Sequence, residues 1–321
     1  MFLKKKDFIV ILGWIITILV FAIIARHLNF KEFIEHLKKV SYFDLFILIA
    51  IYLIGFVIRG ARTKIMLPTL NFKQALGGIF VGYAANNILP ARLGELLRAQ
   101  VIGKHSNISR SIIFSNILVE RILDGVAIVL LLFWGASSLE LPKWIDNLKN
   151  LGLIIFSVSI AGLIFINFLN IKYKFTFKDN FLGNFIKNIL EGFRISMKSP
   201  KMFILVLLIS IFIWAFESIM FYYGLGIFNI PRSFHLACLI LGITNLAVLV
   251  PSSPGGVGVF EATALATLKI FKVAMPLALA YGSVVHACQL IPVVIIGILF
   301  MPYFGLKSLK ITNDSKIDIS S

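Results

Sequence analysis

Charged residues are scarce in this sequence, and so is cysteine. Only 14% of the 321 residues are charged, against about 25% in soluble proteins. Hydrophobic residues make up 59% of the chain, and the mean hydropathy is +0.94. The two cysteines, Cys238 and Cys288, each lie in an apolar run, so neither a disulfide framework nor a metal-binding spacing is implied. The composition excludes a soluble globular protein and predicts an integral membrane protein.

Acidic residues are few relative to basic ones, 15 against 31, which gives a net charge of +16. In a soluble protein such an excess would favour nucleic acid binding. Here the lysines and arginines lie mainly between apolar runs, as the positive-inside rule predicts for cytoplasmic loops. We therefore expect no nucleic acid partner, and we expect contact with anionic lipid head groups.

Residue sets typical of catalysis are also missing. The sequence contains no Ser/His/Asp set, no cluster of metal ligands and no phosphate-binding lysine loop. The glycines from Gly255 to Gly258 follow no strand pattern, so they are not a nucleotide-binding fingerprint. We expect no enzymatic activity, no cofactor and no metal in this chain.

Six apolar runs are long enough to cross about 30 Å of hydrocarbon. They cover 8–25, 43–58, 111–133, 151–169, 202–222 and 274–300. Lysines flank the first and the last run, which places both termini in the cytoplasm, and the first run is a retained span because no cleavage site closes it. Arg59 and Arg62 are expected to follow the second run on the cytoplasmic side. Two connectors are amphipathic: 26–42, expected at the outer interface, and 170–201, a basic cytoplasmic connector.

Two further stretches carry polar groups that lipid cannot solvate. The first, from Gly82 to Arg98, contains Asn-Asn-Ile-Leu-Pro-Ala-Arg-Leu-Gly-Glu, and the second, from Gly242 to Glu261, contains Pro-Ser-Ser-Pro-Gly-Gly-Val-Gly. Positive charge on both flanks predicts that the first enters from the cytoplasm and turns back, while the second is expected to enter from outside. Both belong to a weak sequence repeat that opens with a small polar residue and Phe and continues to Gly, Asn and Pro.

These features predict a single membrane domain over 1–321 with an all-α polytopic fold. About six full transmembrane helices are expected, together with two re-entrant helical hairpins in an inverted repeat. Repeat one covers about 43–133 and repeat two about 202–302. Secondary transporters built in this way bind substrate near the midplane, where discontinuous helices meet.

A substrate site is expected where the two broken stretches meet. Its candidate residues are Asn86, Asn87, Arg92, Glu95, Arg98, Asn245, Ser252, Gly255, Gly256, Gly258 and Glu261. The planar guanidinium of Arg92 is expected to bind phosphate with Glu95 as its orienting partner, and Arg98 is a further ligand or a cytoplasmic anchor. Free N–H groups of the glycines are expected to complete an anion cradle. Structural alternatives remain open: helix caps at the asparagines and Glu261, an interfacial salt bridge for the arginines, and a plain turn for the glycines.

A second set of polar residues lies within the spans and is expected to form a buried network: Glu120, Arg121, Asp124, Glu217 and His286. Two carboxylates one helical turn apart repel each other unless a cation is near. Arg121 is expected to reach Asp124, and Arg92 is a candidate partner for Glu120. The network is either structural or carries a carboxylate that couples transport to protons. Glu217 and His286 are expected to be packed hydrogen-bonding residues.

The paired motifs, Asn-Asn-Ile-Leu-Pro-Ala-Arg-Leu-Gly-Glu-Leu-Leu-Arg and Pro-Ser-Ser-Pro-Gly-Gly-Val-Gly-Val-Phe-Glu, resemble those of the lysylphosphatidylglycerol synthase transmembrane family, also described as flippase-like proteins. The resemblance covers nearly the whole chain. It implies a prokaryotic cell-membrane protein that handles a lipid. Larger relatives are fused to a cytoplasmic aminoacyl-transferase domain. Only about 20 residues follow Phe300 here, so we expect a stand-alone member without a synthase domain.

The leading hypothesis is a transporter that moves an anionic phospholipid or a polyprenyl-phosphate-type amphiphile between leaflets. Two alternatives stay open. One is a proton-coupled transporter of a small soluble anion. The other is the membrane subunit of a lipid-modifying system of the phosphatidylglycerol lysyltransferase type, whose catalytic half is a separate enzyme.

Overall fold

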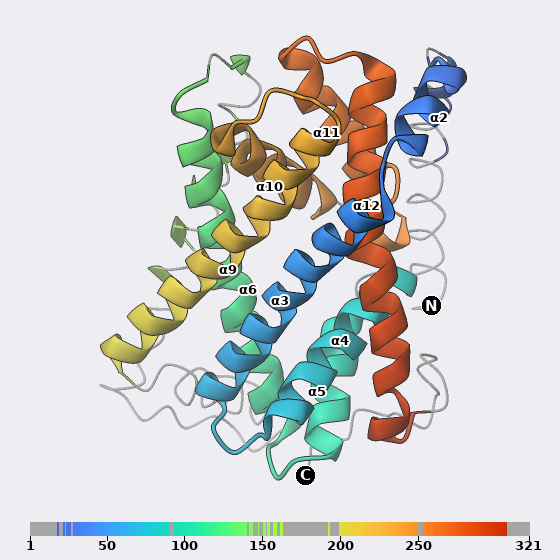
Figure 1. The fold of residues 1–321 in the computed structure, drawn as a ribbon. Coiled ribbons are helices and arrows are strands. Elements are labelled where there is room, and N and C mark those ends of the chain that lie inside the picture. The colour runs from blue at the N-terminus through green and yellow to red at the C-terminus, as the bar shows by residue number, and fades with distance from the viewer. Residues whose placement is uncertain are drawn as a thin grey trace, which may run out of the picture.

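The computed structural model describes residues 28–89, 93–139, 199–249 and 253–306, with isolated positions between 18 and 26, between 141 and 162, and at 192. All regular elements in these ranges are helical (Figure 1): α2 Phe30–Lys38, α3 Tyr42–Met66, α4 Phe72–Ile88, α5 Gly94–Lys104, α6 Arg110–Ala136, α9 Pro200–Ile227, α10 Phe234–Val248, η2 Pro254–Gly256, α11 Val259–Ile270, α12 Met275–Phe300 and η3 Pro302–Phe304. The predicted spans at 8–25 and 151–169, the connector 170–201 and the tail from 307 onward lie largely outside the described residues.

Three segments are apolar and long enough to cross a membrane, judged by length and composition: α3, α9 and Met275–Phe304. They match predicted runs. α6 matches the run at 111–133, and its 27 residues extend over about 40 Å, but it carries two carboxylates and an arginine in its middle. α2 is amphipathic as predicted: Phe33 and Leu37 pack against the core, while Phe30 and Ile34 are exposed.

The second predicted span is longer than the sequence indicated. α3 begins with a capping box, in which Ser41 and Asp44 each bond the other's backbone N–H. The helix continues eight residues past the expected end at 58, because no proline occurs before Pro68. Arg59 and Arg62 therefore lie inside the helix, 3% and 1% exposed, and the prediction that they follow the span is wrong.

The repeated sequence pattern marks the start of equivalent helices. Asn71 caps α4 and Ser233 caps α10, and each side chain accepts the backbone N–H three residues further on. Each helix ends just before a proline; Pro90 and Pro251 themselves lie outside the described residues. The short helices α5 and α11 follow. The two predicted interruptions are thus confirmed in the backbone.

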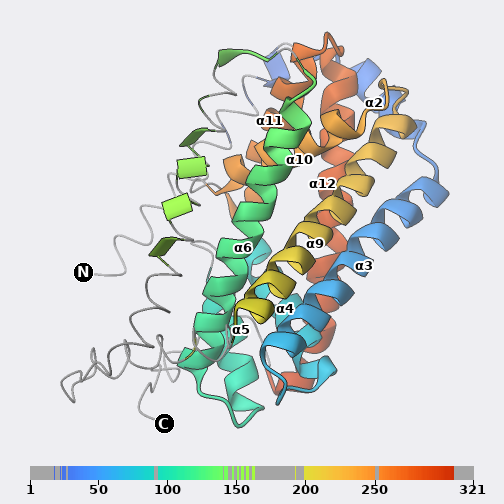
Figure 2. The ribbon, with the colours of Figure 1, turned by 90° about the vertical axis from the view of Figure 1, so that its left-hand side faces the viewer.

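Helices α3–α6 and α9–α12 pack in matching patterns. α4 packs on α12, and α10 packs on α6; α5 lies against α4 and α6, and α11 lies against α10 and α12; α3 and α9 lie against each other. Each of these contacts in one unit thus has a counterpart in the other. Figures 1 and 2 show α4 and α5 at one end of the helix assembly and α10 and α11 at the opposite end.

Glycines allow the closest of these helix crossings. A Cβ at Gly297 of α12 would lie 2.4 Å from the Cβ of Ala84 on α4. At the matching crossing, a Cβ at Gly135 of α6 would lie 2.7 Å from the backbone of His235 and Leu239 on α10. Small residues at such crossings let helix backbones approach closely.

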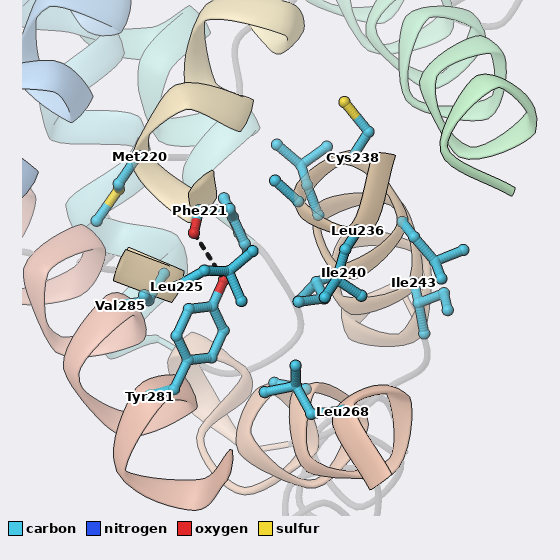
Figure 3. Close-up of a cluster of buried hydrophobic side chains, with 14 of the residues drawn as sticks. Met220, Phe221, Leu225, Leu236, Cys238, Ile240, Ile243, Leu268, Tyr281 and Val285 are labelled. Carbon is cyan, nitrogen blue, oxygen red and sulfur yellow. Dashed lines mark hydrogen bonds between the residues drawn. The ribbon is translucent and has the colours of Figure 1, made fainter. Parts of the chain in front are cut away.

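An apolar core surrounds α10 and joins it to α6, α9, α11 and α12. Figure 3 shows part of it, with Phe221 and Leu225 of α9 facing Tyr281 and Val285 of α12. The Tyr281 hydroxyl, fully buried, donates a hydrogen bond of 3.1 Å to the Phe221 carbonyl. This core fixes the second broken pair against the long helices that carry the charged groups.

Candidate functional site

A cavity of about 660 Å³ lies between the two helical units. Its wall draws residues from both broken pairs and from all four long helices. Of the predicted site and network residues, those that line it are Asn86, Asn87, Glu95, Arg121, Asp124, Glu217, Asn245, Gly255, Gly256 and His286. The prediction that the two interruptions share one site is therefore supported by their common cavity wall.

Other predicted residues lie elsewhere. Arg98, Glu120, Gly258 and Glu261 are described but stand behind the cavity wall rather than in it. Arg92 and Ser252 fall outside the described residues, so the expected roles of Arg92 as phosphate ligand and as partner of Glu120 stay predictions.

One ion pair at the cavity wall joins α3 to α6. Arg62 donates from Nη1 to Asp124 Oδ1 at 2.5 Å and from Nη2 to Asp124 Oδ2 at 3.1 Å. Its Nη1 also donates to the Ser210 hydroxyl of α9 at 2.7 Å. The expected pairing of Asp124 with Arg121 is wrong: the two-pronged guanidinium of Arg62 takes that place, because α3 extends far enough to present it.

A second pair joins α5 to α6. Arg98 donates to both oxygens of Glu120, at 2.7 and 3.2 Å, and to the Thr63 hydroxyl at 2.9 Å. That hydroxyl in turn donates to Glu120 at 2.6 Å. Arg98 is only 2% exposed, so the alternative of a cytoplasmic anchor is wrong. Breaking such a buried pair on one side costs about 3–5 kcal/mol, which makes this cluster a structural support.

A third pair reaches the cavity. Arg59 Nη2 donates to Glu217 Oε2 at 2.6 Å, and Gln289 of α12 donates to the other Glu217 oxygen at 3.3 Å. The Arg59 guanidinium lies 5.0 Å from the Trp214 ring centroid, while its Nε and Nη1 are buried without a hydrogen-bond partner. Arg59 was missed as a site residue. The carboxylates at 120, 124 and 217 could have indicated it, because buried carboxylates need cationic partners and Arg121 alone could not serve all three.

Arg121 differs from these three arginines. Its Nη2 donates to the Tyr83 hydroxyl at 2.9 Å, and the guanidinium lies 5.0 Å from the Tyr83 ring centroid. Its Nε is buried and has no partner. Among the described residues, no carboxylate forms an ion pair with Arg121. A cation that lines the cavity without a carboxylate partner is suited to bind an anion.

The first interruption is held by an asparagine. Asn86 accepts the Gly94 N–H at 2.7 Å and donates from Nδ2 to both oxygens of Glu95, at 3.0 and 3.1 Å. A Cβ at Gly94 would lie 1.9 Å from the Gly82 carbonyl, so only glycine fits there. The capping alternative for Asn86 is correct, and it ties α4 to α5 across the break.

The second interruption is held by a carboxylate and an imidazole. Glu261 accepts the Gly258 N–H at 2.6 Å, and its other oxygen lies 2.7 Å from His286 Nδ1. The Gly256 N–H is bonded to the Ser253 carbonyl at 2.9 Å. The expectation of free glycine N–H groups is therefore wrong at Gly256 and Gly258, because local turn bonds already use them. The capping alternative for Glu261 is correct.

The chemistry available in the cavity is that of binding. Guanidinium groups of Arg59 and Arg121, the phenol of Tyr83 and the amides of Asn87 and Asn245 face a space that also has apolar walls. Within the part of the chain that the structure describes, no group of three or more His, Cys, Asp or Glu residues could hold a metal ion.

The chain is similar in sequence to a known family and to membrane proteins of archaea. The family described as the lysylphosphatidylglycerol synthase TM region matches residues 10–297. A UPF0104 membrane protein of Methanocaldococcus jannaschii is 31% identical over 196 residues, covering 58% of this chain and 79% of that protein. A UPF0104 membrane protein of Methanothermobacter thermautotrophicus is 22% identical, covering 71% of this chain and 74% of that protein.

A third relative is larger. The glycosyltransferase AglD of Haloferax volcanii is 23% identical over 296 residues, which are 78% of this chain but only 47% of that protein. No solved structure matches the chain.

Proposed function

The chain belongs to the lysylphosphatidylglycerol synthase TM-region family, and on that premise we propose that this membrane protein is a lipid transporter. It moves an anionic phospholipid or a polyprenyl-phosphate-type amphiphile between the two leaflets. The head group enters the cavity between the two broken helix pairs, and the acyl chains stay in the surrounding lipid.

One observation carries the proposal: two arginines on the cavity wall retain unused donors. Arg59 has two buried N–H positions without a partner, and Arg121 has one and forms no ion pair with a carboxylate among the described residues. A phosphate supplies several acceptors at once for guanidinium groups that line the same space. Tyr83, Asn87 and Asn245 line the same space and are suited to the glycerol or sugar oxygens of a head group.

The membrane arrangement that fits this role is an inverted repeat within one domain. Repeat one contains α3–α6 and repeat two contains α9–α12. The pairs α4–α5 and α10–α11 dip in from opposite faces as re-entrant hairpins and meet at the cavity. Their positions at opposite ends of the helix assembly (Figures 1 and 2) support this arrangement. The cell membrane is the proposed location, with both termini in the cytoplasm.

A partner enzyme is a second proposal. The relative named a glycosyltransferase matches this chain over only 47% of its own length. In this proposal a separate lipid-modifying enzyme delivers its lipid product to the cavity. Copurification of such an enzyme is the test.

The experiment for the main proposal compares two arginine variants. Arg121→Gln removes the unpaired cation of the cavity, and Arg232→Gln removes an exposed arginine as a matched control. Lipids retained by the detergent-purified proteins are identified by mass spectrometry, and the leaflet distribution of labelled phosphatidylglycerol is followed in proteoliposomes. Because hydrogen bonds to charged groups contribute about 1.5–3 kcal/mol, Arg121→Gln is expected to lose about tenfold or more in affinity.

The control variant is expected to behave as wild type. If both variants move and retain the lipid equally well, the cavity is not the site. If uptake of a labelled soluble anion depends on Arg121 while lipid movement does not occur, the substrate is the small anion.

A further inference from the structure

The two contacts of His286 cannot both be hydrogen bonds if the imidazole is neutral and the neighbouring carboxylate is ionised. Its Nε2 lies 3.0 Å from the Gly255 carbonyl, and its Nδ1 lies 2.7 Å from a Glu261 oxygen. A carbonyl can only accept, so Nε2 carries a hydrogen. If Nδ1 were then bare, two lone pairs would face each other across 2.7 Å. The pair must therefore hold one more proton than a neutral imidazole beside a carboxylate.

We propose that Glu261 and His286 form a proton-binding site, and that its proton holds the η2 turn closed over the cavity. When the proton leaves to cavity water, the net charge of the pair falls from zero to −1. Neutral His286 can then keep only one of its two contacts. The bond to the carboxylate is the stronger, because one partner is charged, so the contact with Gly255 is lost.

The released contact lies where the two broken pairs meet. Gly255 has a φ of +70°, and a Cβ there would lie 2.7 Å from Leu290 of α12 and 3.4 Å from the Asn87 carbonyl at the end of α4. His286 itself is fixed, since its ring stacks on Phe260 at 4.3 Å with an angle of 13°. Loss of the proton therefore frees the turn that closes the second interruption against the first.

The other ionisable groups are less suited to this role. Those that share the cavity wall with His286 are Tyr52 and Arg59 of α3, Tyr83 of α4, Glu95 of α5, Arg121 and Asp124 of α6, and Glu217 of α9. Asp124 and Glu217 are held by guanidinium groups, and Glu95 by an amide that cannot titrate.

Ionisable groups also lie on the helices around the pair. On α11 and α12, which carry Glu261 and His286, Lys269 lies in the last turn of α11, and Tyr281 and Cys288 of α12 are buried. α10, packed on α11, carries His235 and Cys238 near its start. Histidine is the side chain that changes charge between pH 5 and 8.

Resting on the proposed function, this site couples protons to the lipid. An anionic head group near the pair is favoured when the pair is neutral and disfavoured when it is anionic. By linkage, head-group binding and proton binding then strengthen each other equally. This transfers the predicted proton-coupling role from Glu120 and Asp124, which are locked in ion pairs, to the second interruption.

The test measures the proton and the turn separately from transport. The protein is placed in lipid nanodiscs with ¹⁵N-labelled histidine, and the spectra are followed from pH 5 to 9. With five histidines in the chain, the His286→Gln variant identifies the signal. We expect one histidine whose Nε2 loses its proton across this range while its Nδ1 stays protonated, and we expect the Glu261→Gln variant to shift that change.

The turn is followed by the labelling of Ser253→Cys, a buried position next to η2, in a background with Cys238→Ala and Cys288→Ala. The thiolate is the reactive form and its fraction also rises with pH, so each rate is divided by that of a free cysteine at the same pH. Release of a single proton predicts that this ratio rises about tenfold per pH unit until the open state dominates. His286→Gln should abolish this dependence, while His235→Gln, a histidine outside the site, should retain it.

The outcomes separate the two proposals. If His286 does not titrate and labelling is independent of pH, the proton site is rejected, even when lipid movement depends on Arg121. If labelling follows pH as expected but no lipid moves, the proton site stands and the lipid-transport proposal fails.

Discussion

The two helical units pack alike but differ in charge. In α3–α6 lie Arg59, Arg62, Arg98 and Arg121, with Glu120 and Asp124. In the described part of α9–α12, the buried ionisable network is limited to Glu217, Glu261 and His286, and Arg232 is exposed in the loop before α10. Equivalent helices therefore have equivalent neighbours, while the arginines and most of the buried carboxylates are concentrated in one unit.

This difference shows how the units are joined. The first unit has more buried cations than its own carboxylates can pair, and Glu217 and Ser210 of the second unit complete the set. Burying an unpaired charge is far more costly than burying a neutral group. The pairs across the interface therefore hold the charged unit against the apolar one.

The largest effect is expected when a buried ion pair of the charged unit is broken. Arg62→Met removes the partner of Asp124 and is expected to lower stability by about 3–5 kcal/mol, because it leaves a buried carboxylate uncompensated. Thermal unfolding of the detergent-purified protein measures the loss. The double variant Arg62→Met with Asp124→Leu should recover most of it, since an apolar replacement of a whole buried pair is often neutral. A double variant as unstable as the single one would contradict the assignment of the pair.

A smaller effect tests whether the two crossings are equivalent. Gly297→Ala and Gly135→Ala each place a Cβ within 2.7 Å of the facing helix. Overpacking of this kind costs about 1–3 kcal/mol. Gly60→Ala is the control, because its Cβ would meet only side chains of Leu76 and Phe72 at 3.2–3.3 Å. Thermal unfolding should show similar losses at both crossings and a smaller loss at the control.

The smallest effect concerns the caps that open the two repeated segments. Asn71→Ala and Ser233→Ala each remove an N-cap and are expected to cost about 0.5–2 kcal/mol. The loss should be greater at Asn71, because Gln74 completes a capping box there and its side chain also bonds the His105 carbonyl. Unfolding midpoints in one detergent give the comparison. An unfolding midpoint equal to that of wild type in both variants would contradict the prediction that these N-caps stabilise the starts of α4 and α10.

The sequence by itself determined the class of the molecule and the places where its helices break. Hydropathy and prolines are local properties, so the interruptions near Pro90 and Pro251 followed from the chain alone. The shared cavity was also predicted in outline, because polar groups in an apolar chain must gather where lipid is excluded.

Only the tertiary structure decided which charges meet. Asp124 pairs with Arg62, 62 positions away, rather than with Arg121 on its own helix, and Glu217 pairs with Arg59, 158 positions away. Such partners depend on where a helix ends and which face its neighbour presents, and neither is a local property of the sequence. For the same reason the spacing predicted an ion pair between Arg121 and Asp124, whereas the Arg121 guanidinium bonds the Tyr83 hydroxyl and forms no ion pair among the described residues.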